Sequence, residues 1–527
     1  MVGTARNISR RSLVSGAVAT GVLGSCAATR AFADETLAAA PAKWDAAMPE
    51  AWDREVGVVI AGTGIAGASA AVEAFDAGMG VLVLTATDDI IDCSCTISGG
   101  ALSGCCTSLQ EDEGIEDSVE AFIRDIRADG GDFGDLECVT AWAENSGDTV
   151  DWLIDLGCEV NSMVMQPESH SVARSYNSLP AGNGLGWMEG LKGAIEERGV
   201  EVIYSTPVTR IYREADGRVV GVEATPKDGS GPINVKATQG IIMATGGIGS
   251  NVDLWAMYAP VMQQIKKEAK AMLSCAPVDV NGKGIELLRD VDAYIGLTVP
   301  NYGGGGIVVD PNKPANATLL PYSWKDHPLI EVNANGERFN NESSFSEYFD
   351  QKPYRDQPGM WHVVVFDENG RMSEGGQRFG QVILDACAES GITDTVFSAN
   401  TLEELADHYG MDPQKLVAAV DDYNAHVDSQ EADAFGRTEF VSKIDTPPFW
   451  GIEQDIVFAT SKGGAKINAR AQVLDNMGQV IPGLYAAGEV AFFPIHGNGK
   501  IHIVGGCNGS AATYGRIAVW SIAEDSE

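Results

Sequence analysis

Three glycines near the start of the chain have the spacing that lets a backbone turn closely around a diphosphate. Gly62, Gly64 and Gly67 follow an apolar run that predicts a buried strand, and Ile65 and Ala66 open a stretch of small residues that predicts a helix. In such a turn the first glycine permits the bend, the second admits a pyrophosphate, and the third lets the helix pack on the strand. Because a helix N-terminus favours phosphates, the motif predicts a dinucleotide site.

Three further segments of small and polar residues accompany this motif. They are Ser98-Gly99-Gly100 after the second predicted strand, Ala244-Thr245-Gly246-Gly247 at the end of a later strand, and Gly488-Glu489 near the C-terminus. Each segment is unspecific alone, but the combination is specific. Together they resemble the fumarate reductase and succinate dehydrogenase flavoprotein family, which also contains ketosteroid dehydrogenases and urocanate reductases. The resemblance runs from about residue 56 to the C-terminus.

The resemblance implies FAD as the cofactor, held without a covalent bond. Relatives that attach the flavin covalently use a histidine near the Ser-Gly-Gly segment, where this chain has Cys93-Ser94-Cys95-Thr96. By the same resemblance, Glu489 faces the ribityl and ribose region, and the Val208 backbone meets the adenine. Asn508 and Ser510 would then lie under the isoalloxazine ring.

Two positions depart from the family's FAD-binding pattern. Thr85 stands at the end of the second predicted strand, where an acidic residue usually binds the ribose. Lys283 stands between Gly282 and Gly284, where the family has an acidic residue. Both changes remove a carboxylate from the expected cofactor site.

The resemblance also implies a proton donor for a reduction. Arg371 occupies the place of the family's active-site acid, and Glu342 would begin the relay that supplies its proton. A guanidinium normally keeps its proton, so this role needs a carboxylate relay and a desolvated site. The relay's usual second arginine is absent, since residues 343–346 read Ser-Ser-Phe-Ser. A surface arginine in a turn is the alternative interpretation of Arg371.

The segments that grip a dicarboxylate in fumarate reductases differ more strongly. The first has no histidine before Gly463-Gly464, and the second has Lys500, four residues after His496, in place of an arginine. Lysine cannot make arginine's bidentate contact with a carboxylate, although it can polarise a carbonyl. We therefore expect Lys500 and His496 to polarise one carbonyl of an enone or unsaturated lactone. The alternative is that both residues serve only as loop structure over the flavin.

Four cysteines lie close to the Ser-Gly-Gly segment, at positions 93, 95, 105 and 106. Such a group could bind an iron–sulfur cluster or form redox-active pairs. Their spacing matches no standard cluster motif, so buried free thiols are the competing interpretation. The sequence leaves the presence of a metal open.

The pattern of apolar, small and turn-forming residues indicates which elements carry these groups. Strands are expected at 56–61, 81–84 and 240–244, a hairpin around Asp216-Gly217, and helices at 66–77, 401–408, 412–427 and 511–523. The Gly/Pro/Asn-rich stretch 301–317 is expected to be loop or tight turns. These elements predict an α/β fold, namely a glutathione-reductase-like FAD-binding domain with an inserted α+β capping domain. The expected boundaries are 34–54 for a linker, 55–321 and 449–527 for the FAD-binding domain, and 322–448 for the cap.

Residues 1–33 have the features of an export signal. Arg10-Arg11 and the following apolar stretch resemble a twin-arginine leader, and Ala31-Phe32-Ala33 fits a cleavage site. A lipid anchor at Cys26 is a minor alternative. The net charge of −38 argues against a nucleic-acid partner. No second dinucleotide motif follows, so we expect a separate electron donor, such as a membrane-associated cytochrome.

The expected reaction is hydride transfer from reduced FAD to an activated C=C, with Arg371 protonating the neighbouring carbon. Three alternatives stay open at this point. The same fold could act in reverse as a 3-ketosteroid dehydrogenase, or it could reduce an acrylate or urocanate-type acid. A degenerate flavoprotein that serves as an electron-transfer or binding module is the alternative of another class.

Overall fold

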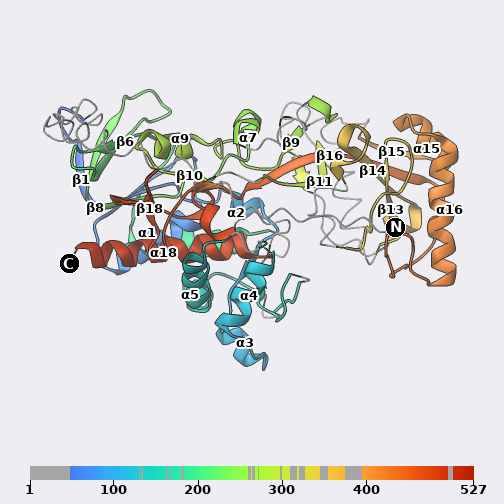
Figure 1. Cartoon of the computed structure of the whole chain (residues 1–527), viewed down its shortest axis with the longest axis horizontal. Helices are drawn as coiled ribbons and strands as arrows, with labels where there is room; N and C mark the ends of the chain where they lie inside the picture. The colour runs from blue at the N-terminus through green and yellow to red at the C-terminus, as the bar shows by residue number, and fades with distance from the viewer. Residues whose placement is uncertain are drawn as a thin grey trace, which may run out of the picture.

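The computed structural model shows an elongated molecule with two lobes, one around α1 and α18 and one around α15 and α16 (Figure 1). It describes residues 48–526 except for these segments: 130, 132–133, 162–163, 168, 180–182, 259–262, 264–266, 271, 297–299, 309–316, 320–326, 345–353, 374–394 and 497–502. The first 47 residues, and with them the expected leader, Cys26 and most of the linker, lie outside the described part.

The first lobe is built on a sheet of eight strands in the described part of the chain, in the order β18-β19-β8-β1-β2-β5, with β7 also paired to β8 and β6 paired to β7. Its central strands are parallel. The strands are β1 (Arg54–Ala61), β2 (Val81–Leu84), β5 (Glu201–Ile203), β6 (Val208–Arg213), β7 (Val219–Ala224), β8 (Ile233–Met243), β18 (Gln472–Leu474) and β19 (Val480–Ala486). The expected hairpin is confirmed, because β6 and β7 pair antiparallel around Asp216-Gly217.

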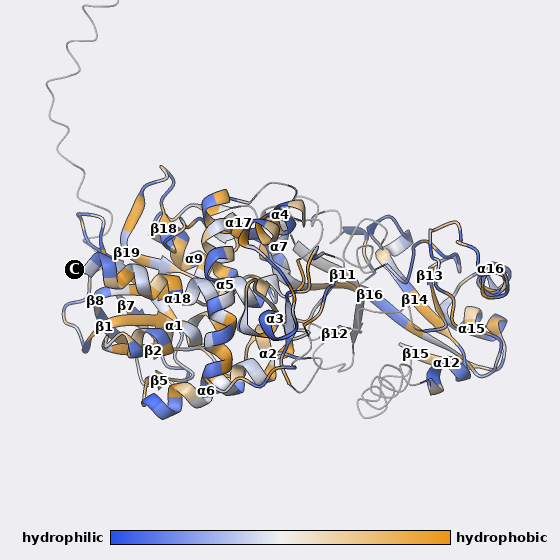
Figure 2. Ribbon diagram, turned by 90° about the horizontal axis from the view of Figure 1, so that it is seen from below, coloured by the Kyte–Doolittle hydropathy of each residue, from blue (hydrophilic) through white to orange (hydrophobic). Residues whose placement is uncertain are grey.

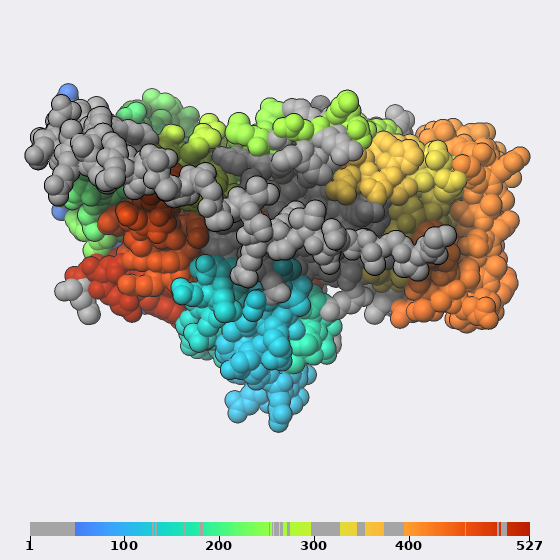
Figure 3. Space-filling model, in the orientation of Figure 1, coloured from blue at the N-terminus to red at the C-terminus, as the bar shows by residue number. Residues whose placement is uncertain are grey.

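Helices cover this sheet and extend the lobe. α1 packs against α18, and the core of the lobe includes apolar side chains from β1, β2, β8 and both helices (Figure 2). The helices are α1 (Ile65–Asp76), α2 (Ser94–Ile97), α3 (Ser108–Asp112), α4 (Val119–Asp129), α5 (Leu136–Asp155), α6 (Leu185–Arg198), α7 (Val252–Tyr258), α9 (Lys283–Asp290), η4 (Gly488–Val490), α17 (Phe493–His496) and α18 (Gly506–Ser526). α3 and α4 form a projection from this lobe (Figure 3). Two short sheets pair β3 (Ala101–Ser103) with β4 (Ser175–Asn177), and β10 (Ile295–Gly296) with β17 (Gly464–Ala465).

α18 starts five residues before the helix expected at 511. Gly506 and Gly509 lie in its first turn, and glycine has low helix propensity, so the sequence pattern disfavoured a helix there. Packing against β3 explains the glycine, because a Cβ added at Gly509 would lie 2.4 Å from the Ser103 carbonyl oxygen.

The second lobe contains a sheet of seven strands in the described part, in the order β12-β11-β16-β14-β13, with β9 and β15 also paired to β16. The strands are β9 (Met272–Ser274), β11 (Pro300–Val308), β12 (Ala317–Leu319), β13 (Leu329–Asn333), β14 (Trp361–Phe366), β15 (Val396–Ala399) and β16 (Phe449–Ser461). The expectation that 301–317 is only loop is wrong, because β11 pairs with β16 despite its glycines. The sheet also draws β9, β11, β12 and β16 from outside the expected cap boundaries of 322–448.

Helices and short turns complete the second lobe. They are η2 (Pro358–Met360), α12 (Glu368–Met372), α15 (Leu402–Tyr409) and α16 (Pro413–Ser429). Thr401 caps α15 by accepting from the Glu404 N–H, and Asp412 caps α16 before a proline at its first position. A separate core of apolar side chains lies between these helices and β13 to β15. No helix in the described part of the chain is long and apolar enough to cross a membrane.

Candidate functional site: a dinucleotide cavity in the first lobe

The glycine turn between β1 and α1 has a distinct geometry at each of its glycines. Gly62 has a φ of +104°, which favours glycine, and its N–H donates to the Leu84 carbonyl at 2.8 Å. A Cβ added at Gly67 would lie 2.0 Å from the Gly62 carbonyl oxygen, so only glycine lets α1 pack this closely. A Cβ at Gly64 would meet nothing within 4 Å, because Gly64 faces open space. That space is the cavity described next.

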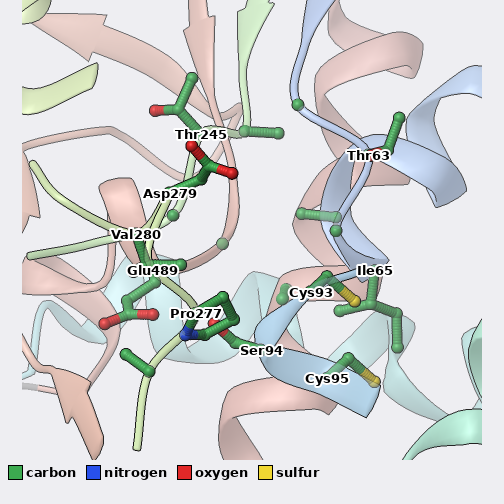
Figure 4. Close-up of a pocket in the computed structure, with 18 of the residues that line it drawn as sticks. Thr63, Ile65, Cys93, Ser94, Cys95, Thr245, Pro277, Asp279, Val280 and Glu489 are labelled. Carbon is green, nitrogen blue, oxygen red and sulfur yellow. The ribbon is translucent and has the colours of Figure 1, made fainter. Parts of the chain in front are cut away.

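A cavity of about 590 Å³ opens beside this turn, within the usual range of about 300–1,000 Å³ for cofactor pockets. All of the cofactor-binding residues expected from the sequence line it, except Gly67 and Ser510. Figure 4 shows Thr63 and Ile65 from the turn opposite Thr245 and Glu489, with Cys93 and Cys95 nearby. Thr245 Oγ1 is buried at this wall and has no hydrogen-bond partner among the described residues. A bound polar group would satisfy it.

One end of the cavity lies at the end of β2 and carries a cluster of threonine hydroxyls. Thr85 Oγ1 lies 3.0 Å from Thr63 Oγ1 and 2.9 Å from Thr87 Oγ1. Val208, at the start of β6, lines the same cavity. A pyrophosphate bound at the α1 N-terminus would leave this end to the adenosine half of a dinucleotide. Neutral hydroxyls thus stand where a carboxylate was expected from the family pattern.

The opposite end is formed by the Ser98-Gly99-Gly100 segment and the start of α18. Asn508 Nδ2 donates to the Ala101 carbonyl at 2.9 Å and to Ser98 Oγ at 3.3 Å, which joins the two segments. Gly100 has a φ of +78°, and a Cβ there would lie 1.9 Å from the Asn183 carbonyl oxygen. The isoalloxazine ring of an FAD whose pyrophosphate lies at α1 would reach this end.

Glu489 lies in η4 on the wall of the cavity. Its Oε1 accepts from the Ser461 N–H at 2.6 Å and from Ser461 Oγ at 2.9 Å. Burial raises the pKa of the Glu489 carboxyl to about 6, although the Ser461 hydrogen bonds and Lys462 oppose that shift. Gly247 provides the space, since a Cβ there would lie 2.0 Å from Ser461 Oγ and 2.4 Å from Glu489 Oε1.

His496 and Ser510 lie behind this wall. His496 Nε2 lies 2.9 Å from Ser510 Oγ, and the His496 ring packs against Phe492 and Trp142. Phe492 lines the cavity, whereas neither His496 nor Ser510 does. Lys500, the other expected carbonyl-polarising residue, lies outside the described residues.

Glu342, expected to begin a proton relay, is fully enclosed in the second lobe. It accepts from Arg338 Nε at 2.9 Å and from Arg437 Nη1 at 3.1 Å, and Arg338 also donates to Asp433 at 2.7 Å. The positive charges of the two arginines therefore balance the negative charges of Glu342 and Asp433. Glu331 is a further buried carboxyl beside this network, and burial raises its pKa to about 7.

Arg371 has a different partner from the one expected. Its Nε donates to Glu368 Oε2 at 2.8 Å, and its Nη2 donates to Oε1 at 2.5 Å. Glu368 lies one turn away on α12, whereas Glu342 is held between two buried arginines, so the relay from Glu342 to Arg371 stays a prediction. The hydrogen bond that Arg371 donates to Glu368 also raises the pKa of Arg371, which makes it a weaker acid in this arrangement. Arg371 does not line the cavity, and α12 lies in the same lobe as α15 (Figure 2).

The four clustered cysteines are free thiols in the structure. Cys93, Cys95 and Cys105 are buried, Cys106 is exposed, and Cys93 and Cys95 line the cavity. Burial raises the pKa of the Cys95 thiol well above its ordinary value. Across the described residues, no group of three or more His, Cys, Asp or Glu side chains is placed to hold a metal ion.

The family model described as "FAD binding domain" matches residues 57–501 of the chain. The chain belongs to this family. Its relatives are fumarate reductase flavoproteins and related reductases of C=C bonds. A probable fumarate reductase, Ifc3, of Shewanella frigidimarina is 26% identical over 88% of this chain and 74% of its own length. The urocanate reductase of Eggerthella lenta is 28% identical over 84% of this chain and 71% of its own length.

The chain also resembles a solved structure across both of its lobes. The open conformation of a flavocytochrome c3 fumarate reductase is 26% identical, with a TM-score of 0.74, over 90% of this chain and 79% of that one. The chain is therefore a FAD-dependent oxidoreductase of a family that acts on C=C bonds. The glycine cradle, the open space at Gly64 and the orphaned Thr245 hydroxyl all fit FAD.

The sequence interpretation missed two sets of buried residues. Arg437 and Asp433 join the Glu342 network from about 95 positions away, and no local motif marks them. Lys462, beside Gly463-Gly464, is only 3% exposed. A lysine inside a glycine-rich segment that faces a predicted cofactor site was the signal that could have singled it out.

Proposed function

We propose that this protein is an exported reductase that transfers hydride from reduced, noncovalently bound FAD to a C=C conjugated to a carbonyl. The observation that carries the proposal is the continuous cavity from the threonine cluster through the glycine turn to Asn508, in a chain of the FAD-binding family. FAD supplies the hydride, and the protein supplies binding, orientation and electrostatic field. The first lobe is then the glutathione-reductase-like FAD-binding domain, and the second is the cap.

An enone or an unsaturated lactone is the proposed acceptor. The segment before Gly463-Gly464 lacks the histidine of fumarate reductases, and Lys500 stands where they have arginine. Both changes weaken a two-point grip on a dicarboxylate, and they leave groups that polarise a single carbonyl. Cardiac glycosides carry such a lactone, and the chain resembles the cardiac glycoside reductase flavoprotein in length and pattern. His496 does not line the cavity in this arrangement, so its proposed role requires its ring to move to the open space.

Arg371 is the proposed proton donor for the second carbon of the alkene. In the described arrangement it is paired with Glu368 and lies outside the cavity, so the role requires the cap to approach the first lobe. β16 joins the two regions: Trp450 near its start donates to Glu368, and Ser461 at its end donates to Glu489. Movement of the cap about this strand would carry Arg371 toward the cofactor.

Replacing Arg371 with alanine tests this assignment. Arg371→Ala should retain FAD, because the cavity residues lie in the first lobe, and should lower alkene turnover by about 100-fold or more, the usual scale for a lost general acid. The measurement is FAD content and steady-state rate with reduced viologen. Lys443→Ala, which removes an exposed ion pair with Asp428 in the same lobe, is the control. Turnover of Arg371→Ala equal to that of the control would remove Arg371 from the mechanism.

The electron donor is proposed to be a separate, membrane-associated cytochrome outside the cytoplasm, reached after twin-arginine export. The proposal draws on the leader-like residues 1–33 and on the single dinucleotide motif. A relative from Shewanella frigidimarina is named "Fumarate reductase (cytochrome)". Reduced viologen should therefore support turnover where NADH does not.

Three alternatives are separable by assay. A 3-ketosteroid dehydrogenase would oxidise a saturated 3-ketosteroid with an artificial acceptor, and solved structures of such enzymes share the fold. An acrylate or urocanate-type reductase would prefer an acid to an enone, and such proteins are among the relatives. A binding or electron-transfer module would hold a flavin that reduces but that no alkene reoxidises.

A further inference from the structure

Lys462 is a buried cation beside the expected flavin end of the cavity. It lies in the turn between β16 and β17 and is 3% exposed. Its Nζ lies 3.7 Å from Cys507 Sγ, and Cys507 lines the cavity at the start of α18. Burying a lysine is costly unless its charge is used or compensated.

A nearby carboxylate compensates Lys462 but lies elsewhere on the wall. Lys462 lowers the pKa of Glu489, so the two charges interact. Glu489 Oε1, however, is held by Ser461 against Gly247, whereas the lysine ammonium reaches to Cys507. The lysine ammonium therefore lies behind the wall, against Cys507 at its α18 end, and the Glu489 carboxylate lies on the wall at its β8 end.

The start of α18 adds positive character to the same place. α18 has 21 residues, and its first turn contains Cys507 and Asn508, which both line the cavity. The N-terminus of such a helix carries a partial positive charge of about half a unit. A buried lysine that is separated from the cavity by Cys507 and a helix N-terminus thus both lie beside the end where the FAD ring is expected.

We propose that Lys462, together with the α18 N-terminus, stabilises the negative charge that the flavin ring gains on reduction. Reduction of the ring then takes up two electrons and one proton, which leaves the ring anionic. Uptake of two electrons and two protons would leave it neutral. The reduction potential of bound FAD is thereby raised, and electrons are drawn from the donor. The inference rests on the proposed function only in placing FAD in this cavity.

The test is the midpoint potential of bound flavin, measured anaerobically with redox mediators and without any alkene. In Lys462→Met, the ratio of reduced to oxidised flavin at the wild-type midpoint should fall about tenfold. This fall corresponds to a midpoint potential lowered by about 30 mV for a two-electron couple. Lys462→Arg should restore most of the ratio because it keeps the charge. Lys466→Met is the matched control: it removes a lysine four residues along the same segment, whose side chain is only partly buried, and it should leave the ratio unchanged.

A wild-type measurement keeps the inference testable if Lys462→Met loses its flavin. Below the pH at which free reduced FAD takes up its second proton, the midpoint of the wild-type enzyme should still change with pH as one proton per two electrons. Glu489, whose pKa burial raises to about 6, titrates in the same range, so Glu489→Gln should give the same count. Two protons per two electrons would overturn the proposal, as would a ratio in Lys462→Met within twofold of wild type. Because no alkene is present, neither result bears on the substrate, and a failure to reduce alkenes would leave this result standing.

Discussion

Gly64→Ala should lose about 100-fold or more in FAD affinity while the apoprotein keeps its stability. A Cβ at Gly64 meets nothing within 4 Å, and its φ of −58° suits any residue, so the fold tolerates the change. The added methyl group projects into the cavity where the backbone would approach the pyrophosphate. Losing one or two charge-assisted hydrogen bonds costs about 1.5–3 kcal/mol each, which corresponds to about two orders of magnitude in affinity. Flavin titration and urea unfolding of the apoprotein measure the two quantities.

Two further glycines serve as controls for that substitution. Gly193→Ala, in α6 with nothing near its added Cβ, should stabilise the protein by about 0.5–1 kcal/mol and leave FAD binding unchanged. Gly67→Ala should destabilise the apoprotein itself, because its Cβ would meet the Gly62 backbone. Wild-type FAD affinity in Gly64→Ala would show that the phosphates do not lie at this turn.

Arg437→Met should destabilise the cap by about 3–5 kcal/mol, the cost of breaking a buried ion pair from one side. Arg437 has no exposed surface and donates to the Leu329 carbonyl, to the His327 carbonyl and to Glu342. Its loss leaves Glu342 with one arginine in a buried site. Chemical unfolding should show the change, and FAD content should persist in mild conditions because the cavity lies in the other lobe.

The matched control for Arg437→Met removes an exposed cation from the same lobe. Lys415→Met breaks an ion pair with Glu337 at the surface and should cost less than about 1 kcal/mol. Equal effects of the two variants would mean that the Glu342 network adds no more stability than a surface pair.

Sequence reasoning succeeded where the determining interactions are local. The turn from Gly62 to Gly67 joins a strand and a helix within a few residues, and α1 begins within one residue of its expected start. Ser98-Gly99-Gly100 and Glu489 could be placed only through the family pattern, because β-strand order brings them together across about 390 positions. Neither periodicity nor composition encodes that distance.

The missed features all depend on long-range packing. β11 is rich in glycine and reads as loop, yet pairing with β16 makes it a strand. Glu342 pairs with Arg437, which reaches it from another loop 95 positions along the chain. Lys462 gains significance only because α18 brings Cys507 against it. In each case the partner lies far along the chain and no motif announces it.

FAD in this cavity is proposed to deliver hydride to a C=C conjugated to a carbonyl. Anaerobic mixing of the fully reduced, FAD-loaded protein with an unsaturated lactone or enone tests this step, while flavin absorbance and product are followed. We expect that flavin reoxidises and that one saturated product forms per FAD, whereas the saturated analogue of the same compound has no effect. Flavin that stays reduced with every enone, lactone, acrylate and urocanate offered would contradict it.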